Sequence, residues 1–369
     1  MSSGGAGGDT GRPVQPSRAE RSGATHRRRR AEAILAVVLV AAGLLFAATQ
    51  VRGARSTATP TPSTSPTPSG SPSSLLAFSV TGGPNALLAV VGSGGGRAPG
   101  ALVLPPGMTV VVPGQGDATT EEVQALPGES MRVAVSNTIG AWTDHYAVTD
   151  LRHLGRIVDR MGGLTVDITD VFTVGNDVLG PGPTHLSGDQ VVAFLRQKVD
   201  DTATRWASVL DAFLAASPDV QPGDLTEADD ATGAAALLGT ATGSAAKVAP
   251  TQDVGGTAVI AQQPDMDQLV GQLFGTPAPV RSLVQNGNGA PGIGEAVASL
   301  ILPEGFRVVL SQNADSFDHA TTEIVAIGKQ HLTDAMEIQK ALGVGKVEVT
   351  QVPSGLADVT ILVGKDFKG

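Results

Sequence analysis

The chain has 369 residues and a formal net charge of −10 at pH 7, which leaves room for two domains and some unstructured sequence. The acidic balance argues against sequence-independent nucleic-acid binding, because that role needs a basic face to neutralise phosphates, so we expect no nucleic-acid partner. The absence of cysteine excludes disulfides, thiol catalysis, cysteine-ligated zinc and a lipid-modified cysteine near the N-terminus.

The N-terminal part predicts a cytoplasmic tail and a membrane anchor. Residues 1–30 are polar, end in four arginines and predict disorder. Residues 31–51 contain an uncharged run close to the ~20 residues that span a bilayer as a helix. A cleaved signal peptide is the alternative, but the preceding segment is long and no small-x-small cleavage site follows. The arginine cluster predicts a single-pass plasma-membrane protein with a cytoplasmic N-terminus and extracytoplasmic domains.

Residues 52–74 predict an extended stalk. The run 56–74 is built from Ser, Thr, Pro, Gly and Ala, so it cannot pack a core. Its repeated prolines favour polyproline II structure. Glycosylation of this stalk stays an open alternative.

From Leu75 onwards, short Val- and Leu-rich runs separated by Gly and Pro predict strands. They cover residues 75–80, 87–91, 101–104 and 108–112. The glycine-rich run 92–96 invites comparison with a phosphate-binding loop. No Gly-Lys-Ser/Thr follows it and no helix opens there, so a hairpin turn is the better interpretation.

The segment 144–214 has the strongest pattern in the chain. Apolar residues recur at helical spacing over 151–161, with Asp150 placed to cap the helix and two glycines to end it. Strict alternation then predicts a half-buried strand over 164–168. Further on, Ser187 opens a capping box before the next helix.

Three cations gather near the junction of two predicted helices. Arg196 and Lys198 lie at the far end of the helix that follows Ser187. Arg205 lies in the first turn of the next helix, whose apolar face recurs at i, i+3, i+4, i+7 and i+8 from Trp206 to Leu214.

The remainder predicts a helix mixed with loops over 219–250, a short helix over 265–274, and a hinge at 276–279. Beyond the hinge, strands and helices alternate with a glycine turn between them, which is typical of a βαβ unit in a small α/β sandwich. One expected strand ends at Val284, and four more cover 306–310, 323–327, 347–351 and 358–363. Helices are expected over 293–302 and 331–342.

The runs DHYAVTDLRHLGRIVDRMGGLTVDI, LSGDQVVAFLRQK and RWASVLDAFL resemble the catalytic domain of the LytR-CpsA-Psr family. The resemblance covers roughly 75–275 and implies membrane-anchored enzymes that transfer a glycopolymer from a polyprenyl-pyrophosphate carrier onto the bacterial cell wall. The runs LVQNGNGAPGIG, NADSFDHATTEIV and ADVTILVGKDF resemble the LytR C-terminal domain, over 279–369. The expected fold class is therefore α/β, a LytR-CpsA-Psr-like domain followed by a small α/β sandwich, after one transmembrane helix.

The resemblance implies that Arg196, Lys198 and Arg205 hold the carrier's pyrophosphate, which suits a permanently charged, forked guanidinium. Lys198 stands where the family usually has arginine, so the charge is kept and the fork is lost. The alternative is structural: these side chains cap helix C-termini or pair with Asp200 and Asp201. The two aspartates themselves fit helix caps better than a cation site.

The other half of the implied site departs from the family. The family has an Arg-x-Asp motif ahead of one apolar strand, and the aspartate of this motif coordinates magnesium. It has a Pro-Arg-Asp motif after a second strand. Here Gly83 and Asn85 occupy the first place, and Pro106 and Gly107 the second. A neutral amide is a poor magnesium ligand and proline cannot bind phosphate with its side chain. Losing these charges should cost many orders of magnitude in transfer rate.

Two further patterns have plain structural interpretations. Gly287-x-Gly289-x-x-Gly292 meets the dinucleotide spacing, with Asp315 within reach of a ribose, but the domain is too small for the double βαβαβ arrangement. The glycines are better explained as turn residues. The histidines at 153, 185, 319 and 331 lie at no metal-binding spacing.

We therefore expect a non-catalytic cell-envelope protein, without cofactor or metal, that binds a polyprenyl-linked lipid, a wall glycan or a partner transferase. The alternative is an active Mg-dependent glycopolymer phosphotransferase in which Asp117, Glu121 or Glu122 replaces the missing carboxylate. Transcription regulation follows only from the historical family label, and it is disfavoured because the folded part should lie outside the cell.

Overall fold

The computed structural model describes residues 73–83, 86–94, 97–197, 199, 201–241, 243, 245–255 and 259–369. In this part of the chain no helix is both long and apolar enough to cross a membrane. The predicted tail, the predicted membrane helix at 31–51 and nearly all of the predicted stalk lie outside the described residues.

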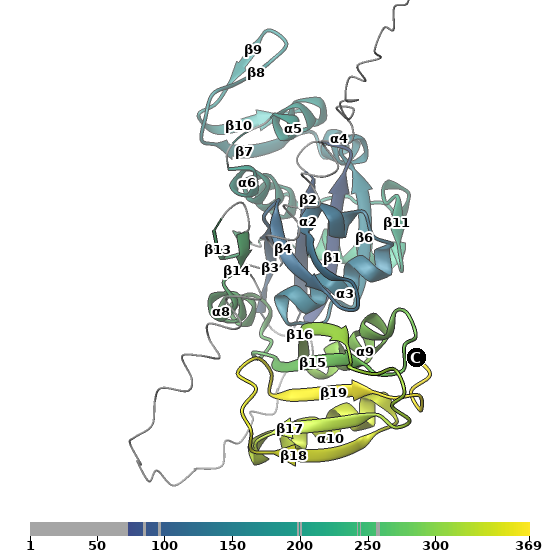
Figure 1. Ribbon diagram of the computed structural model, residues 1–369. Coiled ribbons are helices and arrows are strands. Elements are labelled where there is room, and N and C mark those ends of the chain that lie inside the picture. Colours follow the sequence, from purple (N-terminus) through teal and green to yellow (C-terminus); the bar gives the residue numbers. More distant parts are fainter. Residues whose placement is uncertain are drawn as a thin grey trace, which may run out of the picture. The chain divides into compact units, whose positions relative to one another are not determined.

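A six-stranded sheet forms the centre of the larger α/β part, in the order β11-β6-β1-β2-β3-β12 (Figure 1). Its strands are β1 (Ser73–Thr81), β2 (Leu87–Gly94), β3 (Arg97–Leu104), β6 (His145–Asp150), β11 (Glu227–Ala228) and β12 (Ala245–Val248). β1 and β2 pair antiparallel, as do β2 and β3, whereas β6 runs parallel to β1 and β12 parallel to β3.

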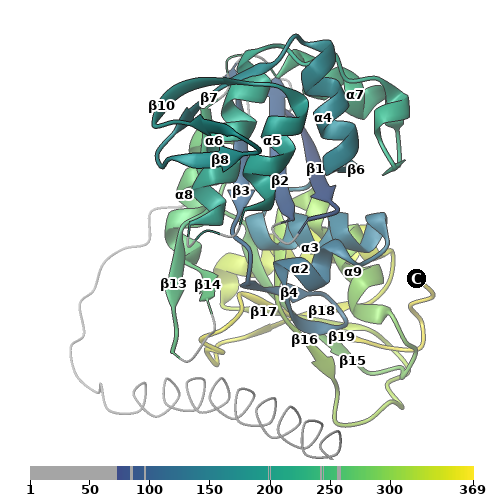
Figure 2. The ribbon, with the colours of Figure 1, turned by 90° about the horizontal axis from the view of Figure 1, so that it is seen from above.

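Alternation along the three middle strands explains why both faces of this sheet are covered. In β1 the side chains of Leu76, Phe78 and Val80 belong to one apolar core, and those of Leu75 and Ala77 belong to another. Successive side chains of a strand point to opposite faces, so a strand that is apolar on both faces must be covered on both faces of the sheet. Figure 2 shows β1, β2 and β3 between α4 and α7 on one side and α3 on the other.

Further helices and strands make up the rest of this part. The helices are α2 (Thr120–Gln124), α3 (Gly128–Ile139), α4 (Leu151–Arg160), α5 (Gly188–Arg196), α6 (Thr202–Ala215), α7 (Ala231–Thr240) and α8 (Gln263–Phe274). The strands form a sheet of β13 (Thr251–Asp253), β14 (Val259–Ala261), β4 (Met108–Val112) and β5 (Gly116–Thr119), and two pairs, β10 (Gly182–Leu186) with β7 (Leu164–Ile168) and β8 (Phe172–Val174) with β9 (Asp177–Leu179).

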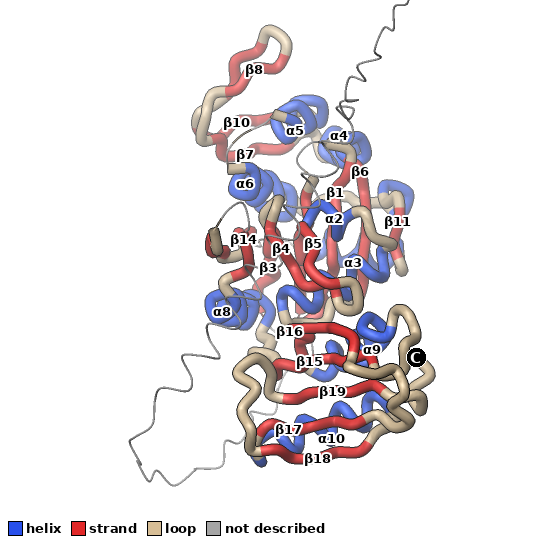
Figure 3. Tube along the Cα trace, in the orientation of Figure 1, coloured by secondary structure: helices blue, strands red, loops and turns tan. Residues whose placement is uncertain are grey.

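The C-terminal part is a five-stranded sheet with two helices. Figure 3 shows its strands and helices alternating in colour along the chain. The sheet order is β16-β15-β19-β17-β18. The elements are β15 (Val280–Asn286), α9 (Ile293–Ile301), β16 (Phe306–Asn313), β17 (Glu323–Ile327), α10 (Leu332–Leu342), β18 (Lys346–Thr350) and β19 (Val359–Val363). β15, α9 and the parallel β16 form the predicted βαβ unit.

Buried polar groups join the C-terminal part to α3. Asn137, only 2% exposed, accepts a hydrogen bond from the backbone N of Val308 at 2.7 Å and donates to its carbonyl at 2.9 Å. Arg307, 5% exposed, donates to the carbonyl oxygen of Asn137 at 3.1 Å and pairs with Asp267 of α8 at 2.7 Å. The guanidinium therefore caps the C-terminus of α3, where carbonyl groups lack helical partners.

The structure confirms a mixed α/β fold and most of the predicted elements. The predicted strand 164–168 and the helix capped by Asp150 are present, with Asp150 accepting from the backbone N of His153 at 2.8 Å. β2 and β3 form the predicted hairpin, and β1 begins at Ser73, earlier than expected. The described residues between 73 and 369 belong to one compact unit, and the domain bounds 75–275 and 279–369 stay predictions.

Several elements were not predicted. α3 has an apolar but weakly periodic sequence, and nine of its residues are buried because it lies between β4, β6 and α9. The segment 219–250 was predicted as a helix with loops, but it also contains the strand β12. β12 has ordinary composition, and its pairing with β3 is a long-range contact that no local pattern reveals.

Asn137→Ala should lower the free energy of unfolding by about 3 kcal/mol, because it leaves the buried amide and carbonyl of Val308 without partners. The exposed Asn313→Ala is the matched control and should change it by less than about 0.5 kcal/mol. Urea unfolding followed by circular dichroism measures both. An equally small loss in both variants would contradict a stabilising role for the contact between Asn137 and Val308.

Candidate functional site

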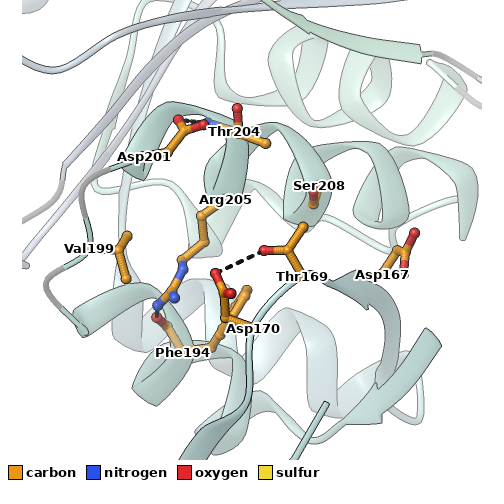
Figure 4. Close-up of a pocket in the computed structure, with 9 residues that line it drawn as sticks. All are labelled: Asp167, Thr169, Asp170, Phe194, Val199, Asp201, Thr204, Arg205 and Ser208. Atoms are coloured by element: carbon orange, nitrogen blue, oxygen red, sulfur yellow. Dashed lines mark hydrogen bonds between the residues drawn. The ribbon is translucent and has the colours of Figure 1, made fainter. Parts of the chain in front are cut away.

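A cavity of about 480 Å³ opens where β7 ends and α6 begins (Figure 4). Its wall comes from the end of β7 and the residues after it, the C-terminal turn of α5 and the first two turns of α6. The lining residues are Asp167, Thr169, Asp170, Phe194, Val199, Asp201, Thr204, Arg205 and Ser208. The wall is mostly polar, so this cavity suits a hydrated ligand rather than a lipid tail.

Arg205 is the one predicted cation that lines this cavity, among the residues described. Its guanidinium carbon lies 4.2 Å from the centroid of the Phe194 ring, and its Nη1 donates to the Phe194 carbonyl at 2.7 Å. Figure 4 shows the side chain reaching along the wall to that carbonyl. Burial lowers the pKa of Arg205, and the negative charge of Asp170 opposes that shift. Arg205 thus caps α5, as the structural alternative predicts.

Three carboxylates share the cavity with that single guanidinium. Asp201 accepts from the backbone N of Thr204 at 3.0 Å and caps α6, which confirms the cap predicted for one of the two adjacent aspartates. Asp170 accepts from the hydroxyl of Thr169 at 3.2 Å. The lining carries an excess of negative charge, so a multiply charged anion would meet repulsion that Arg205 alone does not cancel.

Of the two other predicted cations, only Arg196 is among the described residues, and it does not line the cavity. Arg196 is the last residue of α5, and its side chain is exposed. Lys198 lies outside the described residues, as does Asp200. The structure therefore brings Arg205 into a cavity and leaves Arg196 in solvent, and a role in holding pyrophosphate stays a prediction for all three cations.

Beneath the cavity, α6 packs tightly on the central sheet. The apolar seam there is lined by Phe78, Val80, Leu87, Leu154, Trp206, Val209, Leu210 and Phe213. Its volume is only about 10 Å³, which is close to the minimum for one water molecule. A polyprenyl chain would have to separate α6 from the sheet to enter this seam.

The other half of the implied site lies along the edge of the central sheet that is formed by strand ends. At this edge β1 and β3 end and β2 begins. Gly83, Pro106 and Gly107 lie at this edge, and Asn85 is outside the described residues. The backbone N of Gly107 donates to Oε2 of Glu121 at 2.9 Å. The resembled family has arginine and aspartate at these places. Here the Glu121 carboxylate is bound to the backbone, and none of the described residues Gly83, Pro106 and Gly107 is a cation.

Neutral polar groups complete the same edge, and no sequence motif marks them as site residues. Gln124 donates to the carbonyl of Leu87 at 2.5 Å and to the hydroxyl of Ser79 at 3.2 Å. Thr120 donates to the carbonyl of Pro105 at 2.9 Å. Ser79 and Thr120 are buried, so α2 is fixed over the strand ends. The only signal in the sequence is a capping box at Thr119, which predicts the short helix α2 but not its place.

The substitute carboxylates proposed for an active enzyme have different surroundings. Glu121 lies at the sheet edge, whereas Glu122 completes the capping box of α2 and Asp117 is exposed on β5. Within the residues that the structure describes, no group of three or more His, Asp or Glu side chains is placed to hold a metal ion.

The glycine motif at 287–292 forms a turn between β15 and α9. Asn286 accepts from the backbone N of Gly289 at 2.9 Å, and Gly289 and Gly292 have φ angles of +77° and +76°. The first turn of α9 lies against Gly114, so close that a Cβ on Gly294 would come within 2.4 Å of the Gly114 backbone N. The start of α9, which would hold a pyrophosphate in a dinucleotide site, is therefore covered by protein.

The fold and the site define a class of protein. It is a mixed α/β protein whose larger part has a sheet covered on both faces, a polar cavity at the start of α6, and a small α/β sandwich docked on α3. Residues 108–205 match the LytR_cpsA_psr family, and residues 279–367 match the family described as LytR cell envelope-related transcriptional attenuator. The chain therefore carries a domain of the LytR-CpsA-Psr family and a LytR C-terminal domain.

Solved structures of the same family are similar to the chain at low identity. B. subtilis TagV is 15% identical with a TM-score of 0.45, over 55% of this chain and 96% of its own. A LytR-Csp2A-Psr enzyme from Actinomyces oris is 17% identical with a TM-score of 0.43, over 56% and 91%. B. subtilis TagT is 17% identical with a TM-score of 0.41, over 57% and 93%.

These TM-scores lie below 0.5, so the family assignment rests on the two sequence matches. A search of curated proteins gave no match to the chain.

Arg205→Ala should lower the free energy of unfolding by about 1 to 2 kcal/mol, because it removes both the cap on α5 and the stacking on Phe194. The exposed Arg196→Ala should change it by less than about 0.5 kcal/mol. Thermal and urea unfolding of both variants measure the difference. Equal losses for the two variants would contradict a structural role that is special to Arg205.

Proposed function

We propose that the chain is an extracytoplasmic cell-envelope protein that binds a polyprenyl-linked lipid, a wall glycan or a partner transferase without catalysing transfer. In this proposal residues 31–51 anchor it in the plasma membrane, with the N-terminus in the cytoplasm and the described residues outside. The family matches support the cell-envelope role. The site chemistry supports the non-catalytic part.

The single observation that carries the non-catalytic proposal is the sheet edge at Gly83, Pro106 and Gly107. Glu121 binds the backbone there, and none of these four residues is a cation. Transfer from a pyrophosphate requires positive charge where negative charge builds on the leaving oxygen. An edge with an acidic side chain and no arginine in those places raises the energy of that transition state.

Lipid binding is the version of the proposal that the family favours most directly. One similar structure is described as TagT with bound octaprenyl pyrophosphate lipid. In this chain Arg196 is exposed at the end of α5, and Arg205 lines the cavity at the start of α6 while it caps α5. The three carboxylates of the cavity oppose a pyrophosphate, so we propose binding of moderate affinity, with no magnesium or other cofactor required.

The second candidate function is an active Mg-dependent phosphotransferase, and one observation favours it. Glu121 is fixed at the sheet edge, in the region where the family's carboxylate would be needed. A carboxylate is a suitable magnesium ligand, so Glu121 is the residue that an active enzyme would have to use.

Full-length protein in detergent, given a polyprenyl-pyrophosphate-linked glycan, cell-wall glycan fragments as the acceptor and magnesium, should transfer no glycan phosphate to the acceptor and release no polyprenyl monophosphate above the protein-free rate. Thin-layer chromatography of a radiolabelled lipid measures this. Magnesium-dependent release that is lost in Glu121→Gln and kept in Glu122→Gln would overturn the non-catalytic proposal and establish the second candidate.

Titration calorimetry with a short polyprenyl pyrophosphate tests the lipid version. We expect saturable binding that weakens roughly tenfold in Arg196→Ala, because one charge-assisted hydrogen bond to phosphate is removed. Lys329→Ala, an exposed cation of the C-terminal part, is the control and should leave the affinity unchanged. No saturable heat with the wild-type protein would exclude the lipid and leave the glycan and the partner transferase.

A further inference from the structure

The strand β18 forms an open edge of the C-terminal sheet. It is the last strand in the sheet order, and among the described residues it pairs with β17 alone. The backbone N of Lys346 donates to the carbonyl of Thr322 at 2.9 Å, so the even-numbered residues of β18 bond to β17. Backbone groups alternate along a strand. The N–H and C=O groups of Val347 and Val349 therefore point to the open side.

Other sheet edges of this protein are closed by side chains. At the opposite edge of the same sheet, Asn137 bonds both the N–H and the C=O of Val308. At the β12 edge of the central sheet, the backbone N of Ala246 donates to Oδ1 of Asp211 at 3.1 Å. An open edge is a template for a further strand, and β18 has kept this property.

Apolar side chains lie beside the open edge. Figure 1 shows α10 against β17 and β18, on which it packs. Leu332 and Met336, which are 39% and 55% exposed, lie one turn apart on this helix. Gln339 continues their line and donates to the carbonyl of Gly345, just ahead of β18, so this flank of α10 faces the edge strand. Val349, 40% exposed, points to the same side of the sheet.

We propose that two copies of this chain associate through β18, which pairs antiparallel with the partner's β18 across a two-fold axis at Val347. The N–H of each Val347 donates to the carbonyl of the partner's Val347. Lys346 then lies opposite the partner's Glu348, and the symmetry forms this pair twice. The exposed apolar flanks of α10 lie on the same side of the joined sheets and meet near the axis.

Charge selects this register among those that the backbone allows. The outward-pointing groups of Val347 and Val349 must face outward-pointing groups of the partner. An axis at Glu348 would place the two Glu348 carboxylates directly opposite each other, where like charges repel. An axis at Val349 would place Lys346 opposite an uncharged valine, the partner's Val352. Only the axis at Val347 pairs both charges of the strand.

The same feature identifies the occupant as a second copy. The order Lys-x-Glu is complementary to itself in an antiparallel pair, so each copy supplies the strand that the other needs. Each copy has a net charge of −10, and at physiological ionic strength the repulsion between copies is screened over ~8 Å. The contacts at the axis are shorter than this distance. The pairing does not depend on the proposed function, because β18 contributes no residue to the cavity at α6.

Sedimentation velocity of the full-length protein, with detergent micelles in excess and at physiological salt, tests the association. We expect a dimer whose fraction rises with concentration. Lys346→Glu should weaken it roughly tenfold, because both symmetry-related pairs become repulsive. The charge swap Lys346→Glu/Glu348→Lys should restore it. Lys247→Glu, an exposed lysine on the edge strand β12, is the matched control and should leave the dimer unchanged.

Cysteine cross-linking tests the register, since the chain has no cysteine of its own. In a non-hydrogen-bonded antiparallel pair the Cα atoms are ~4.5 Å apart, within the range of a disulfide. A mixture of Lys346→Cys and Glu348→Cys chains, oxidised with copper phenanthroline, should cross-link, and either chain alone should not.

A monomer at every concentration would overturn the proposal. A dimer that Lys346→Glu leaves unchanged would place the association elsewhere and would also overturn it, as would equal cross-linking in the mixed and unmixed samples. Circular dichroism of the variants should match the wild type, because both charged side chains are exposed. The polyprenyl pyrophosphate titration reports on a different part of the chain, so either idea can fail alone.

Discussion

Burial of β1, β2 and β3 on both faces is the constraint on which the rest of this structure depends. A strand with apolar side chains on both faces offers no position for chemistry along its length. Polar groups can then stand only where the strands end or on the layers that cover them. Gly83, Pro106, Gly107 and Gln124 lie at a strand end, and the cavity around Arg205 lies in a covering layer.

The arginines of the described residues differ in whether the guanidinium group binds a partner within the protein. Arg160, Arg205 and Arg307 each bind a carboxylate or a carbonyl group and stabilise an element end or a contact between elements. Arg152, Arg156 and Arg196 are exposed and have no such described partner. In an acidic chain, only the second kind has its charge available for an anionic ligand. The excess of carboxylates in the cavity further limits what Arg205 can contribute there.

Two contacts join the C-terminal part to the larger part, one at the end of α3 and one at the turn between β4 and β5. Arg307 caps the helix that packs beside β4 and β6, while the first turn of α9 lies against Gly114, in the turn between β4 and β5. The glycine motif at the start of α9 therefore serves a turn and a close backbone approach. A Cβ at Gly294 would meet the Gly114 backbone, so the need for glycine there is steric.

The amino-acid sequence by itself determined the elements whose patterns are local. Capping residues and helical spacing defined α4, α5 and α6, and alternation defined β7, because these signals act within a few residues. It also showed which family residues are replaced at positions 83, 85, 106 and 107. Tertiary structure alone decided that β12 joins the central sheet and that α3 is buried. It also decided that Arg205 stacks on Phe194, Glu121 binds Gly107 and Asn137 bonds Val308. Each of these contacts joins groups whose pairing depends on long-range packing, and the free energy of burying a polar group is fixed by the partner that packing supplies.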